Sequence, residues 1–493
     1  MRGSRTSTGR DATSGRLVLV LSLCGIVVSL QQTLVLPLLP DLPRLLGTTA
    51  DNATWLVTAT LLAGAIATPT VGRLADLYGR RRMMLWTLAV SVLGSVLGAV
   101  TTALPALIGA RVLQGIGMAL VPVGIAVMRD ELPRDRLPLG VAMLSTTLAI
   151  GAGLGPPVAG VVADRLDWHA MFWLTGAFGL LLLVMLVRTL PVSAPPVRRK
   201  FDLRGAVLLT LALTPMLLAL SKGSQWGWLS GLTLGCALGG LALLLAWVPL
   251  EWRTPSPLVD VRVAARPAVL LANGASVLCG FSAFANLLVT AQFLQIPRES
   301  GYGLGLSVTL TGLWMIPQAA AFGVVAPVSA WVTRRFGAQW AMLTGAATMA
   351  VAYAFRPFLS QNLPQIVLGS VVVAAGTAMA YGAAPLLISR IVPATETASA
   401  NGLNVLVRSI GQSTSSAALA VAATVGAVGV GGLLVPGLAA LTTLFWLAAA
   451  SAAVAVLLST AVLRHVREEP DQAADLPAGP SALAAGGGGL DGS

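Results

Sequence analysis

The chain has very little charge for its length. Only 10% of its 493 residues are Asp, Glu, Lys or Arg, and 56% are hydrophobic. A soluble globular domain carries about 25% charged residues, so this composition excludes a soluble globule and indicates a polytopic membrane protein. Lysine is nearly absent: Lys200 and Lys222 are the two lysines among 31 basic residues. Such an excess of arginine, with abundant Ala, Gly and Val, is typical of a GC-rich bacterial genome, and we expect a bacterial protein.

Cysteine and histidine are also rare. The three cysteines, Cys24, Cys236 and Cys279, are far apart and fall within predicted spans, which argues against a disulfide framework or a metal site. The two histidines, His169 and His465, lie near predicted helix ends and give no buried proton relay. We therefore predict no catalytic residue, no metal and no cofactor. An integral-membrane enzyme or sensor is a weaker alternative, because it would need a convergent nucleophile, a metal cluster or a soluble catalytic domain.

Apolar segments long enough to cross a membrane occur along the whole chain. About 20 residues span roughly 30 Å of hydrocarbon, and by that measure the sequence holds about fourteen spans. We place them at residues 17–40, 53–71, 83–101, 104–128, 137–162, 168–187, 205–221, 229–250, 268–293, 304–332, 338–355, 363–388, 398–425 and 436–463.

The distribution of basic residues predicts the orientation. The first span follows a polar segment that includes Arg16 and has no small-residue cleavage site, so we interpret it as retained and not as a signal peptide. Both termini are then predicted to be cytoplasmic in the inner (plasma) membrane, because basic residues concentrate on that side. The net charge of +12 lies in short loops, so membrane lipids are expected partners and nucleic acid is not. The basic residues left outside are Arg44, Arg165, Lys222, Arg298 and Arg356.

Two polar, proline-rich connections, at 188–204 and 251–267, separate six spans, two spans and six spans. The predicted organisation is a cytoplasmic N-terminal tail (1–16), a six-helix bundle (17–190), a linker region with two extra spans (191–267), a second six-helix bundle (268–463) and a disordered cytoplasmic tail (464–493).

The segment 72–82, Gly-Arg-Leu-Ala-Asp-Leu-Tyr-Gly-Arg-Arg-Arg, is the most informative part of the sequence. Gly72 and Gly79 permit tight turns at the inner end of two spans. Asp76 lies where a carboxylate can accept hydrogen bonds from a facing helix N-terminus and pair with nearby arginines. We interpret it as a latch that closes the cytoplasmic side. A plain basic loop with one incidental acid is the alternative.

A weak copy of this segment occurs at 330–337, at a constant offset of 258 residues. Gly337 corresponds to Gly79, whereas Arg334 replaces Asp76. Such an internal repeat is typical of two-fold transporter folds.

Arg111 lies deep in the fourth span, close to Gln114, Gly115 and Gly117. An arginine at the centre of a spanning helix costs about 2.5–3.5 kcal/mol on insertion scales. We therefore expect Arg111 to face a cavity or a partner. Snorkelling to the membrane surface is the alternative.

The fifth span carries Gly151, Gly155, Pro156 and Gly160 in the order Gly-x-x-x-Gly-Pro-x-x-x-Gly. Proline removes a backbone donor and glycine removes the side chain, so this order predicts a kinked helix that packs closely against a neighbour. Glycine and proline are common in spanning helices, and it is the order of the residues that makes the pattern specific.

In order and in the matching spans, these three motifs resemble those of the major facilitator superfamily. The Gly-Pro motif is associated with its antiporter branch, and about fourteen spans make the chain similar to the multidrug efflux branch with two extra central helices. The resemblance implies an all-α integral membrane fold of two six-helix bundles plus two central extra spans. Supporting matches are Trp168 to Phe172, Gln292 to Gln295, Gly301-Tyr302, Asn401 to Asn404, Arg408 and Gly411-Gln412.

The resemblance also implies roles for particular residues. Asp76 with Arg80 and Arg81 would stabilise one gating state, Arg111 would contribute to coupling, and Gly155-Pro156 would bend the fifth helix at the interface of the halves. The predicted gating or coupling residues are Gly72, Asp76, Gly79, Arg80, Arg81, Arg111, Gln114, Gly115, Gly151, Gly155, Pro156, Gly160 and Arg408.

One departure from the family pattern concerns the proton. Relatives carry an aspartate midway along the first span in a Leu-Asp-x-Thr pattern, where this chain has Gln31, and glutamine cannot take up a proton. We expect no other buried acid, because the 19 acidic residues fall in tails, loops or span ends. For Asp130 and Glu131 a solvated loop position is the preferred reading. The candidate protonation sites are Asp76, Asp130 and Glu131 at inner ends and Asp51, Asp164 and Asp167 at outer ends.

The same absence constrains the substrate. A desolvated carboxylate holds a lipophilic cation best, whereas this cavity would offer amides, aromatic rings and arginine. A neutral or anionic amphipathic molecule is therefore favoured. Candidate lining residues, each better explained by packing or lipid contact when taken singly, are Gln31, Gln32, Trp55, Trp314, Met315, Gln318 and Tyr353.

We predict an alternating-access secondary transporter that exports hydrophobic drug-like or endogenous small molecules from the cytoplasm in exchange for protons. An uncoupled facilitator, or a lipid or metabolite carrier, is the main alternative, which the missing first-span acid would suit.

Overall fold

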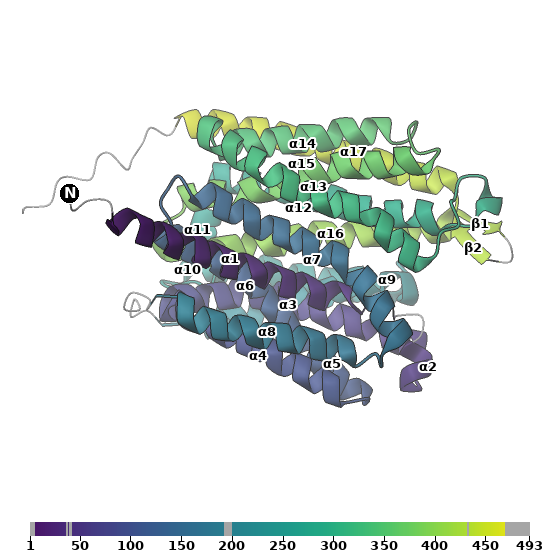
Figure 1. The fold of residues 1–493 in the computed structure, drawn as a ribbon, viewed down its shortest axis with the longest axis horizontal. Helices are drawn as coiled ribbons and strands as arrows, with labels where there is room; N and C mark the ends of the chain where they lie inside the picture. Colours follow the sequence, from purple (N-terminus) through teal and green to yellow (C-terminus); the bar gives the residue numbers. More distant parts are fainter. Residues whose placement is uncertain (1–4, 36–37, 39–41, 192–199, 431–432, 469–493) are drawn as a thin grey trace, which may run out of the picture.

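The computed structural model describes residues 5–35, 38, 42–191, 200–430 and 433–468, which form a bundle of long helices that run along one axis (Figure 1). The first group contains α1 (Arg5–Thr33), the short α2 (Leu42–Leu46), α3 (Ala50–Tyr78), α4 (Arg80–Val100), α5 (Leu104–Ile116), the 3₁₀ turn η2 (Gly117–Ala119), α6 (Leu120–Glu131), α7 (Leu137–Arg165) and α8 (Ala170–Thr189). Between the groups lie α9 (Leu203–Trp226), α10 (Gly231–Arg253) and the short α11 (Val261–Ala264).

The second group contains α12 (Pro267–Gln295), the 3₁₀ turn η3 (Arg298–Ser300), α13 (Val308–Phe336), α14 (Ala338–Phe355), α15 (Leu363–Ile391), the 3₁₀ turn η4 (Ala394–Glu396), α16 (Thr397–Val425) and α17 (Leu438–Glu468). Two short strands, β1 (Ala427–Val430) and β2 (Leu433–Pro436), pair antiparallel between α16 and α17, with Ala427 opposite Pro436.

Eleven helices of the described residues are long and apolar enough to cross a membrane, with α5, η2 and α6 counted as one, Leu104–Glu131. Three further long helices, α7, α14 and α16, run beside them in the same bundle (Figure 1). The described part of the chain therefore holds fourteen membrane-length segments, which confirms the predicted number and the all-helical fold. The first span is shorter than predicted, because it ends at Thr33 and the short α2 follows.

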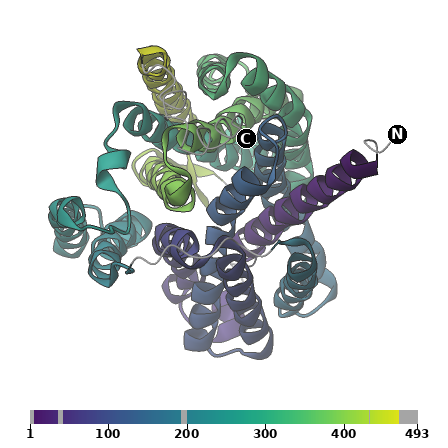
Figure 2. The ribbon, with the colours of Figure 1, turned by 90° about the vertical axis from the view of Figure 1, so that its left-hand side faces the viewer.

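Seen along the bundle, the helices form two groups, with α9 and α10 set apart at one side (Figure 2). These two helices pack against each other, and α9 also contacts α3 of the first group and α16 of the second. Helix α10 keeps much of its surface exposed, since 17% of its most apolar 18-residue stretch is buried. An apolar, exposed surface is expected where lipid is the solvent.

The internal repeat is preserved in the backbone. Helices α3 and α13 both have 29 residues, and their first and last residues are 258 positions apart, as the sequence motif is. Each ends at a glycine in a conformation that L side chains rarely adopt, Gly79 with φ 100° and Gly337 with φ 98°. Glycine is needed at both turns because a side chain would be strained there.

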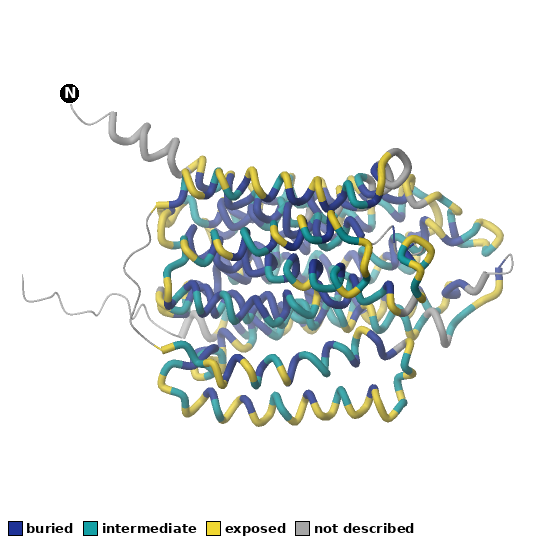
Figure 3. Tube along the Cα trace, turned by 90° about the horizontal axis from the view of Figure 1, so that it is seen from below, coloured by how far each residue is buried: buried dark blue, intermediate teal, exposed yellow. Residues whose placement is uncertain are grey.

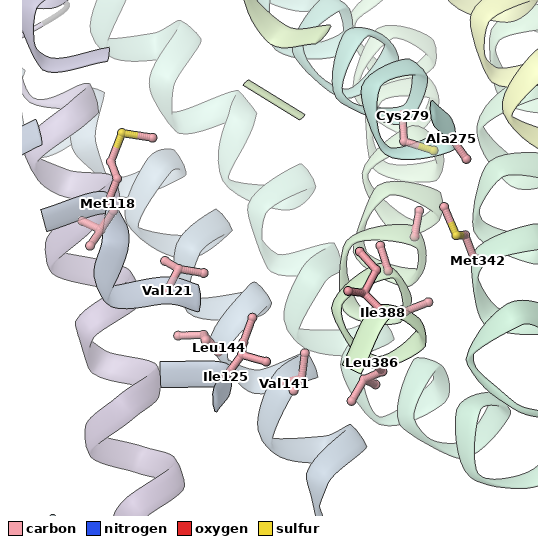
Figure 4. Packing of buried hydrophobic residues seen from close by; sticks show 14 of the residues in the cluster. Met118, Val121, Ile125, Val141, Leu144, Ala275, Cys279, Met342, Leu386 and Ile388 are labelled. Atoms are coloured by element: carbon pink, nitrogen blue, oxygen red, sulfur yellow. The ribbon is translucent and has the colours of Figure 1, made fainter. Parts of the chain in front are cut away.

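Buried residues lie in the interior of the bundle, and exposed residues lie on the outer faces of the helices (Figure 3). The buried apolar residues form a large core cluster. One cluster reaches from Met118 and Ile125 in the first group to Ile388 and Met342 in the second (Figure 4). The two groups are therefore held together by a continuous core.

The two ends of the bundle differ. We call the end where α1 begins the Gly79 end, because α3 ends there at Gly79 and α16 begins there (Figure 1). We call the opposite end, with α2 and the two strands, the β-hairpin end.

Helices α3 and α16 cross at close range near the Gly79 end. A Cβ placed on Gly72 would lie 2.7 Å from the carbonyl oxygen of Ala398, and one on Gly402 would lie 2.8 Å from that of Thr68. Both distances are too short for a real side chain. Glycine at these two positions is therefore what allows the backbones of the two groups to meet.

Replacing Gly402 by leucine should destabilise the protein, because the new side chain would push α16 away from α3. Overpacking of this kind costs about 1–3 kcal/mol. The measurement is thermal unfolding of the purified protein in detergent. Gly109→Leu is the control, since nothing lies within 4 Å of a Cβ at that helical position. Equal unfolding temperatures for the two variants would contradict this account of the crossing.

Candidate functional site

Asp76 joins the two groups at the Gly79 end. Its fully buried carboxylate accepts hydrogen bonds from the backbone N–H groups of Ala398 (3.3 Å) and Ser399 (2.9 Å). These donors belong to the first turn of α16, where N–H groups have no partner within the helix and the helix dipole favours a negative charge. Arg80, one turn later on α4, donates to the same carboxylate at 3.3 Å. Asp76 therefore acts as a cap on a helix of the other group.

Arg129, at the end of α6, makes a second connection between the groups. Its guanidinium donates to the carbonyl of Val392 (3.2 Å) and to the hydroxyl of Thr397, both at the turn between α15 and α16. Asp130, which follows Arg129 in the chain, forms an ion pair with Arg80. We refer to the contacts of Asp76 and Arg129 with the start of α16 as the latch.

The other predicted residues of this segment lie beside the latch. Gly72 sits at the close crossing with α16, and Gly79 forms the turn between α3 and α4. Arg81 donates to the carbonyl of Val187 at 3.2 Å, so it binds the end of α8 in its own group. In the second copy of the motif Arg334 is exposed.

The glycines of α7 pack against α1 of the same group. A Cβ on Gly151 would lie 2.8 Å from the carbonyl oxygen of Ile26, and one on Gly155 would overlap the Thr33 hydroxyl. Another face of α7 meets α13, where Thr146 donates to the carbonyl of Phe322 at 2.9 Å. Helix α7 therefore belongs to the first group and forms part of its contact with the second group. The side chains of Pro156 and Gly160 are outside the described residues.

Arg111 is the centre of a buried polar network in the first group. It is 1% exposed; its Nε donates to the carbonyl of Leu56 (2.8 Å), and its Nη1 donates to the carbonyl of Gln31 (2.6 Å) and to Oε1 of Gln114 (2.7 Å). All three acceptors are neutral, and Nη2 has no hydrogen-bond partner among the described residues. Amide and carbonyl oxygens therefore solvate the charge of Arg111, with no carboxylate of the described residues paired to it.

Hydroxyl groups of α4 complete this network. Ser91 donates to Oε1 of Gln31 at 2.9 Å, and Gln114 donates to Oγ of Ser95, also at 2.9 Å. A small recess opens beside the network, which we call the Arg111 recess. It is lined by Gln31, Leu34, Val35, Arg111, Gln114, Met171, Phe172 and Thr175.

The fourth span changes helix type next to this recess. Its α-helix gives way to the 3₁₀ turn η2 at Gly117, three residues after Gln114. Gly115 lies where a Cβ would overlap the backbone of Thr60 on α3. A 3₁₀ segment inside a long helix often marks a hinge, and here it separates the Arg111 end of the span from the Arg129 end.

The second group has buried arginines of its own. Arg356, 1% exposed, donates to Oδ1 of Asn286 (2.5 Å) and to the hydroxyl of Thr290 (3.0 Å), and lies 4.5 Å from the centre of the Phe445 ring. Arg408 on α16 lies 4.4 Å from the centre of the Tyr381 ring. Ion pairs of the described residues include Arg80 with Asp76 and with Asp130, and His169 with Asp167. Neither Arg356 nor Arg408 is a member of these pairs.

The predicted lining residues are spread over both groups. Gln31 lines the Arg111 recess, and Gln318 accepts a hydrogen bond from Asn286 (3.4 Å) next to Arg356. Tyr353 is fully buried and donates to the carbonyl of Ser282. The others are Trp55, under the ammonium group of Lys222; Met315, buried; Trp314, 42% exposed; and Gln32, half-buried.

Two basic residues that the sequence placed in outer loops are buried. Lys222 and Arg356 are each 1% exposed. Lys222 belongs to the last turns of α9, where its Nζ contacts the Thr54 hydroxyl and the Trp55 ring. Arg356 directly follows α14 and turns back into the bundle. The predicted spans ended just before both residues, so the sequence could not show this inward turn.

The expectation that no acid is buried is wrong. Glu251, near the end of α10, is 1% exposed, and the Asp76 side chain is fully buried. Arg129, Arg356 and Glu251 were all missed as functional candidates. Each lies within about one turn of a span end, where the sequence cannot distinguish an exposed loop from a side chain turned inward.

The other candidate protonation sites are less suited to the task. Asp130 and Glu131 are exposed. Asp167 is exposed too, and the backbone N–H of His169 donates to it at 2.8 Å, which lowers the pKa of its carboxyl below the usual range, so Asp167 stays charged at neutral pH. The side chains of Asp51 and Asp164 lie outside the described residues.

Two related helical groups, polar contacts between them at one end and a buried arginine beside an internal recess are features of a membrane transporter of the secondary type. The model of the Major Facilitator Superfamily matches residues 21–414 and 272–487 of this chain. The chain belongs to that superfamily, which confirms the resemblance seen in its motifs, and it is a multi-pass membrane protein.

Its relatives include proteins named for multidrug resistance and for cephamycin export. The multidrug resistance protein Stp of Mycobacterium tuberculosis is 29% identical over 77% of this chain and 70% of its own length. The cephamycin export protein CmcT of Amycolatopsis lactamdurans is 31% identical over 73% of each chain. The solved structure of the human organic anion transporter MFSD10 is similar, with a TM-score of 0.63 and 17% identity over 90% of this chain and 99% of that chain. The proton:xylose symporter XylE has a TM-score of 0.62 and 16% identity over 92% of this chain and 96% of its own. These two similarities show the fold.

Replacing Asp76 by asparagine should loosen the latch, because the amide cannot offer two charged oxygens to the start of α16. A helix cap is worth about 0.5–2 kcal/mol, which is a change of roughly 2- to 30-fold in the ratio of closed to open forms. Spin labels on Arg82→Cys and Arg390→Cys, in a background without the native cysteines, report the separation of the two groups at the Gly79 end. Asp135→Asn, which removes an exposed acid, is the control. An unchanged distance distribution in Asp76→Asn would rule out the latch.

Proposed function

We propose that this protein exports small amphipathic molecules, neutral or anionic, from the cytoplasm across the inner membrane in exchange for protons. The Gly79 end would be cytoplasmic, and the latch would close that side during the outward-facing half of the cycle. The names of Stp and CmcT support a drug-like or antibiotic cargo for the relatives, and we extend that class to this chain.

The single observation that supports the proposed substrate class is the environment of the Arg111 side chain. Its guanidinium is buried, bound to three neutral acceptors and without a counterion among the described ion pairs, and it lines a recess with Gln31, Phe172 and Thr175. A buried cation without a counterion attracts a negative or hydrogen-bond-accepting group and repels a cation. A molecule with an apolar body and a carboxylate or carbonyl group fits this chemistry.

An uncoupled facilitator is the second candidate. The observation that favours it is Gln31, which lies in the Arg111 network as a hydrogen-bonded amide at the position where the family resemblance implies an acid. A facilitator would keep the latch for gating and would equilibrate its substrate without a proton gradient.

Transport in inside-out membrane vesicles tests the proposal. The lumen of the vesicles is acidified, and the uptake of matched anionic, neutral and cationic fluorescent compounds is followed before and after the gradient is collapsed. For one-for-one exchange of a neutral compound, a gradient of 1 pH unit supports about tenfold accumulation. We expect accumulation of neutral and anionic compounds that collapses with the gradient. Equilibration regardless of the gradient would identify a facilitator, and a strong preference for cations would contradict the assignment of substrate class.

Replacing Gln31 by aspartate should shift selectivity toward cations. The new carboxylate would lie beside Arg111 and offset its charge, which removes the repulsion of a cationic cargo. We expect the ratio of cation to anion transport to rise roughly tenfold, equivalent to about 1.4 kcal/mol. Gln361→Asp, at an exposed position between α14 and α15, adds the same charge far from the recess and should leave the ratio as in the wild type. No change in Gln31→Asp would remove Arg111 from substrate selection.

A further inference from the structure

The second group contains an arginine that matches Arg111 of the first. Arg356 and Arg111 are each 1% exposed. A Cβ placed on Gly369, which lies 258 positions after Arg111, would be 3.3 Å from Cγ and 3.4 Å from Nε of Arg356. The repeat offset therefore leads to the place that Arg356 occupies, although Arg356 reaches it from the end of α14. Each group buries one guanidinium at an equivalent place.

The two guanidinium groups differ in the side chains around them. Arg356 lies 4.5 Å from the centre of the Phe445 ring, and Arg408, also in the second group, lies 4.4 Å from that of Tyr381. The face of an aromatic ring attracts a cation, most strongly where water is excluded. No aromatic ring lies over the guanidinium of Arg111 in the part of the chain that the structure describes. Arg111 therefore lacks a stabilising contact that Arg356 and Arg408 have.

Positions that hold aromatic rings near Arg356 hold polar residues near Arg111. Tyr353 corresponds to Ser95 at the repeat offset of 258 residues. Phe293 and Gln31 each lie two residues before the end of the first long helix of their group, α12 or α1. In the first group Gln31 donates to Oγ of Ser95 at 3.2 Å. The second group therefore surrounds its arginine with rings, and the first group surrounds its arginine with amide and hydroxyl groups.

The last helices of the two groups differ in the same way. Phe445 lies about two turns into α17, and Gly176 lies about two turns into α8. The Phe445 ring centre is 6.2 Å from that of Tyr353, and a Cβ placed on Gly176 would be 3.3 Å from Cβ of Ser95. The neighbours therefore correspond as well. Where the second group has the ring that lies over Arg356, the first group has a glycine.

A recess is present on this side of Arg111. The residues of α8 that line it with Arg111 are Met171, Phe172 and Thr175. The buried Nη2 of Arg111 has no hydrogen-bond partner among the described residues, and leaving a buried donor unpaired is costly. A guanidinium is planar, so it stacks on a ring with its face and donates hydrogen bonds at its edge. The recess offers a ligand both of these contacts.

We infer that the Arg111 recess binds an aromatic or conjugated ring of the transported molecule. The ring stacks on the Arg111 guanidinium as the Phe445 ring does on that of Arg356, and a carboxylate or carbonyl oxygen on a short substituent accepts a hydrogen bond from Nη2. This inference rests on the proposed function and narrows its substrate class to planar aromatic compounds with an acceptor group. The recess is small in this structure, and it widens for the ring as the flexible Met171 side chain moves and the span bends at η2.

Binding to the purified full chain, measured by calorimetry in detergent, tests the preference for a ring. The probes are 2-naphthylacetate, its decahydro analogue with the same charge and a saturated ring, and the aromatic cation 2-(2-naphthyl)ethylammonium. We expect the aromatic anion to bind roughly tenfold more tightly than the saturated anion, equivalent to about 1.4 kcal/mol. Hydrophobicity alone would not give this order, because the saturated ring is at least as apolar. Equal affinities for the two anions, or no measurable binding of the aromatic anion, would overturn the inference.

The same probes separate this inference from the proposed function. Equal binding of the two anions, with weaker binding of the cation, would remove the ring and leave the proposed substrate class intact. Tightest binding of the cation would contradict the substrate class and the inference together. The binding assay has no pH gradient, so a failure of proton exchange in the vesicle experiment would not change its result.

Replacing Arg111 by lysine keeps the charge and removes the planar guanidinium. We expect Arg111→Lys to bind the two anions with equal affinity and still to bind them more tightly than the cation. Arg356→Lys is the matched control, because it makes the same change at the equivalent place of the second group and should keep the tenfold preference. Thermal unfolding shows beforehand that each variant is folded. If Arg111→Lys keeps the preference, or if Arg356→Lys loses it, the ring does not stack on Arg111.

A photochemical measurement on the wild type locates the ring and needs no variant. On illumination, 4-benzoylphenylacetate inserts into nearby C–H bonds, those of methionine among the most reactive, and mass spectrometry locates the adduct. We expect the adduct at Met171 or Phe172, with an excess of 2-naphthylacetate suppressing it far more than an equal excess of the decahydro analogue. Adducts confined to other segments, or equal suppression by the two competitors, would contradict the assignment of the ring to this recess.

Discussion

Hydrocarbon offers no hydrogen-bond partners, so the polar groups between these helices have to find their partners within the protein. This constraint explains why Arg111 collects three carbonyl or amide oxygens and why Asp76 binds the free N–H groups at the start of another helix. It also connects stability to function. A buried polar contact between two helices holds the bundle in one arrangement, and its loss releases both helices together. The contacts of Asp76 and of Arg111 therefore hold helices together, and the proposed function uses the same contacts for gating and for substrate selection.

The two halves share a backbone plan but differ in chemistry. Helices α3 and α13 have the same length, and they and their terminal glycines are separated by the same number of residues, as expected of a duplicated unit. Only the first copy has an acid at the position that meets the partner helix, because Arg334 replaces Asp76 and is exposed. The latch therefore uses the acid of the first copy, and the second copy has no equivalent acid at that position.

Helices α9 and α10 are attached to α3 at both ends of the bundle. Toward the β-hairpin end, Ser221 and Thr58 share a hydrogen bond of 2.9 Å and Lys222 lies over Trp55. At the Gly79 end, Arg73 reaches Ser256, beyond the end of α10. Because α9 also contacts α16, it lies beside the crossing of α3 and α16.

The sequence by itself determined the membrane class, the number of spans, the repeat and the family, because hydrophobic length and the order of glycine, proline and charge in each motif follow directly from the bilayer and from backbone geometry. It also indicated Arg111 and Asp76, since a charge inside or at the end of a span needs a partner. Only the tertiary structure decided which partners they have. It showed that Lys222, Arg356 and Glu251 turn inward and that Arg129 reaches the other group. These residues lie at span ends, where one turn of helix separates water from the interior, and only the packing of neighbouring helices decides which of the two a side chain meets.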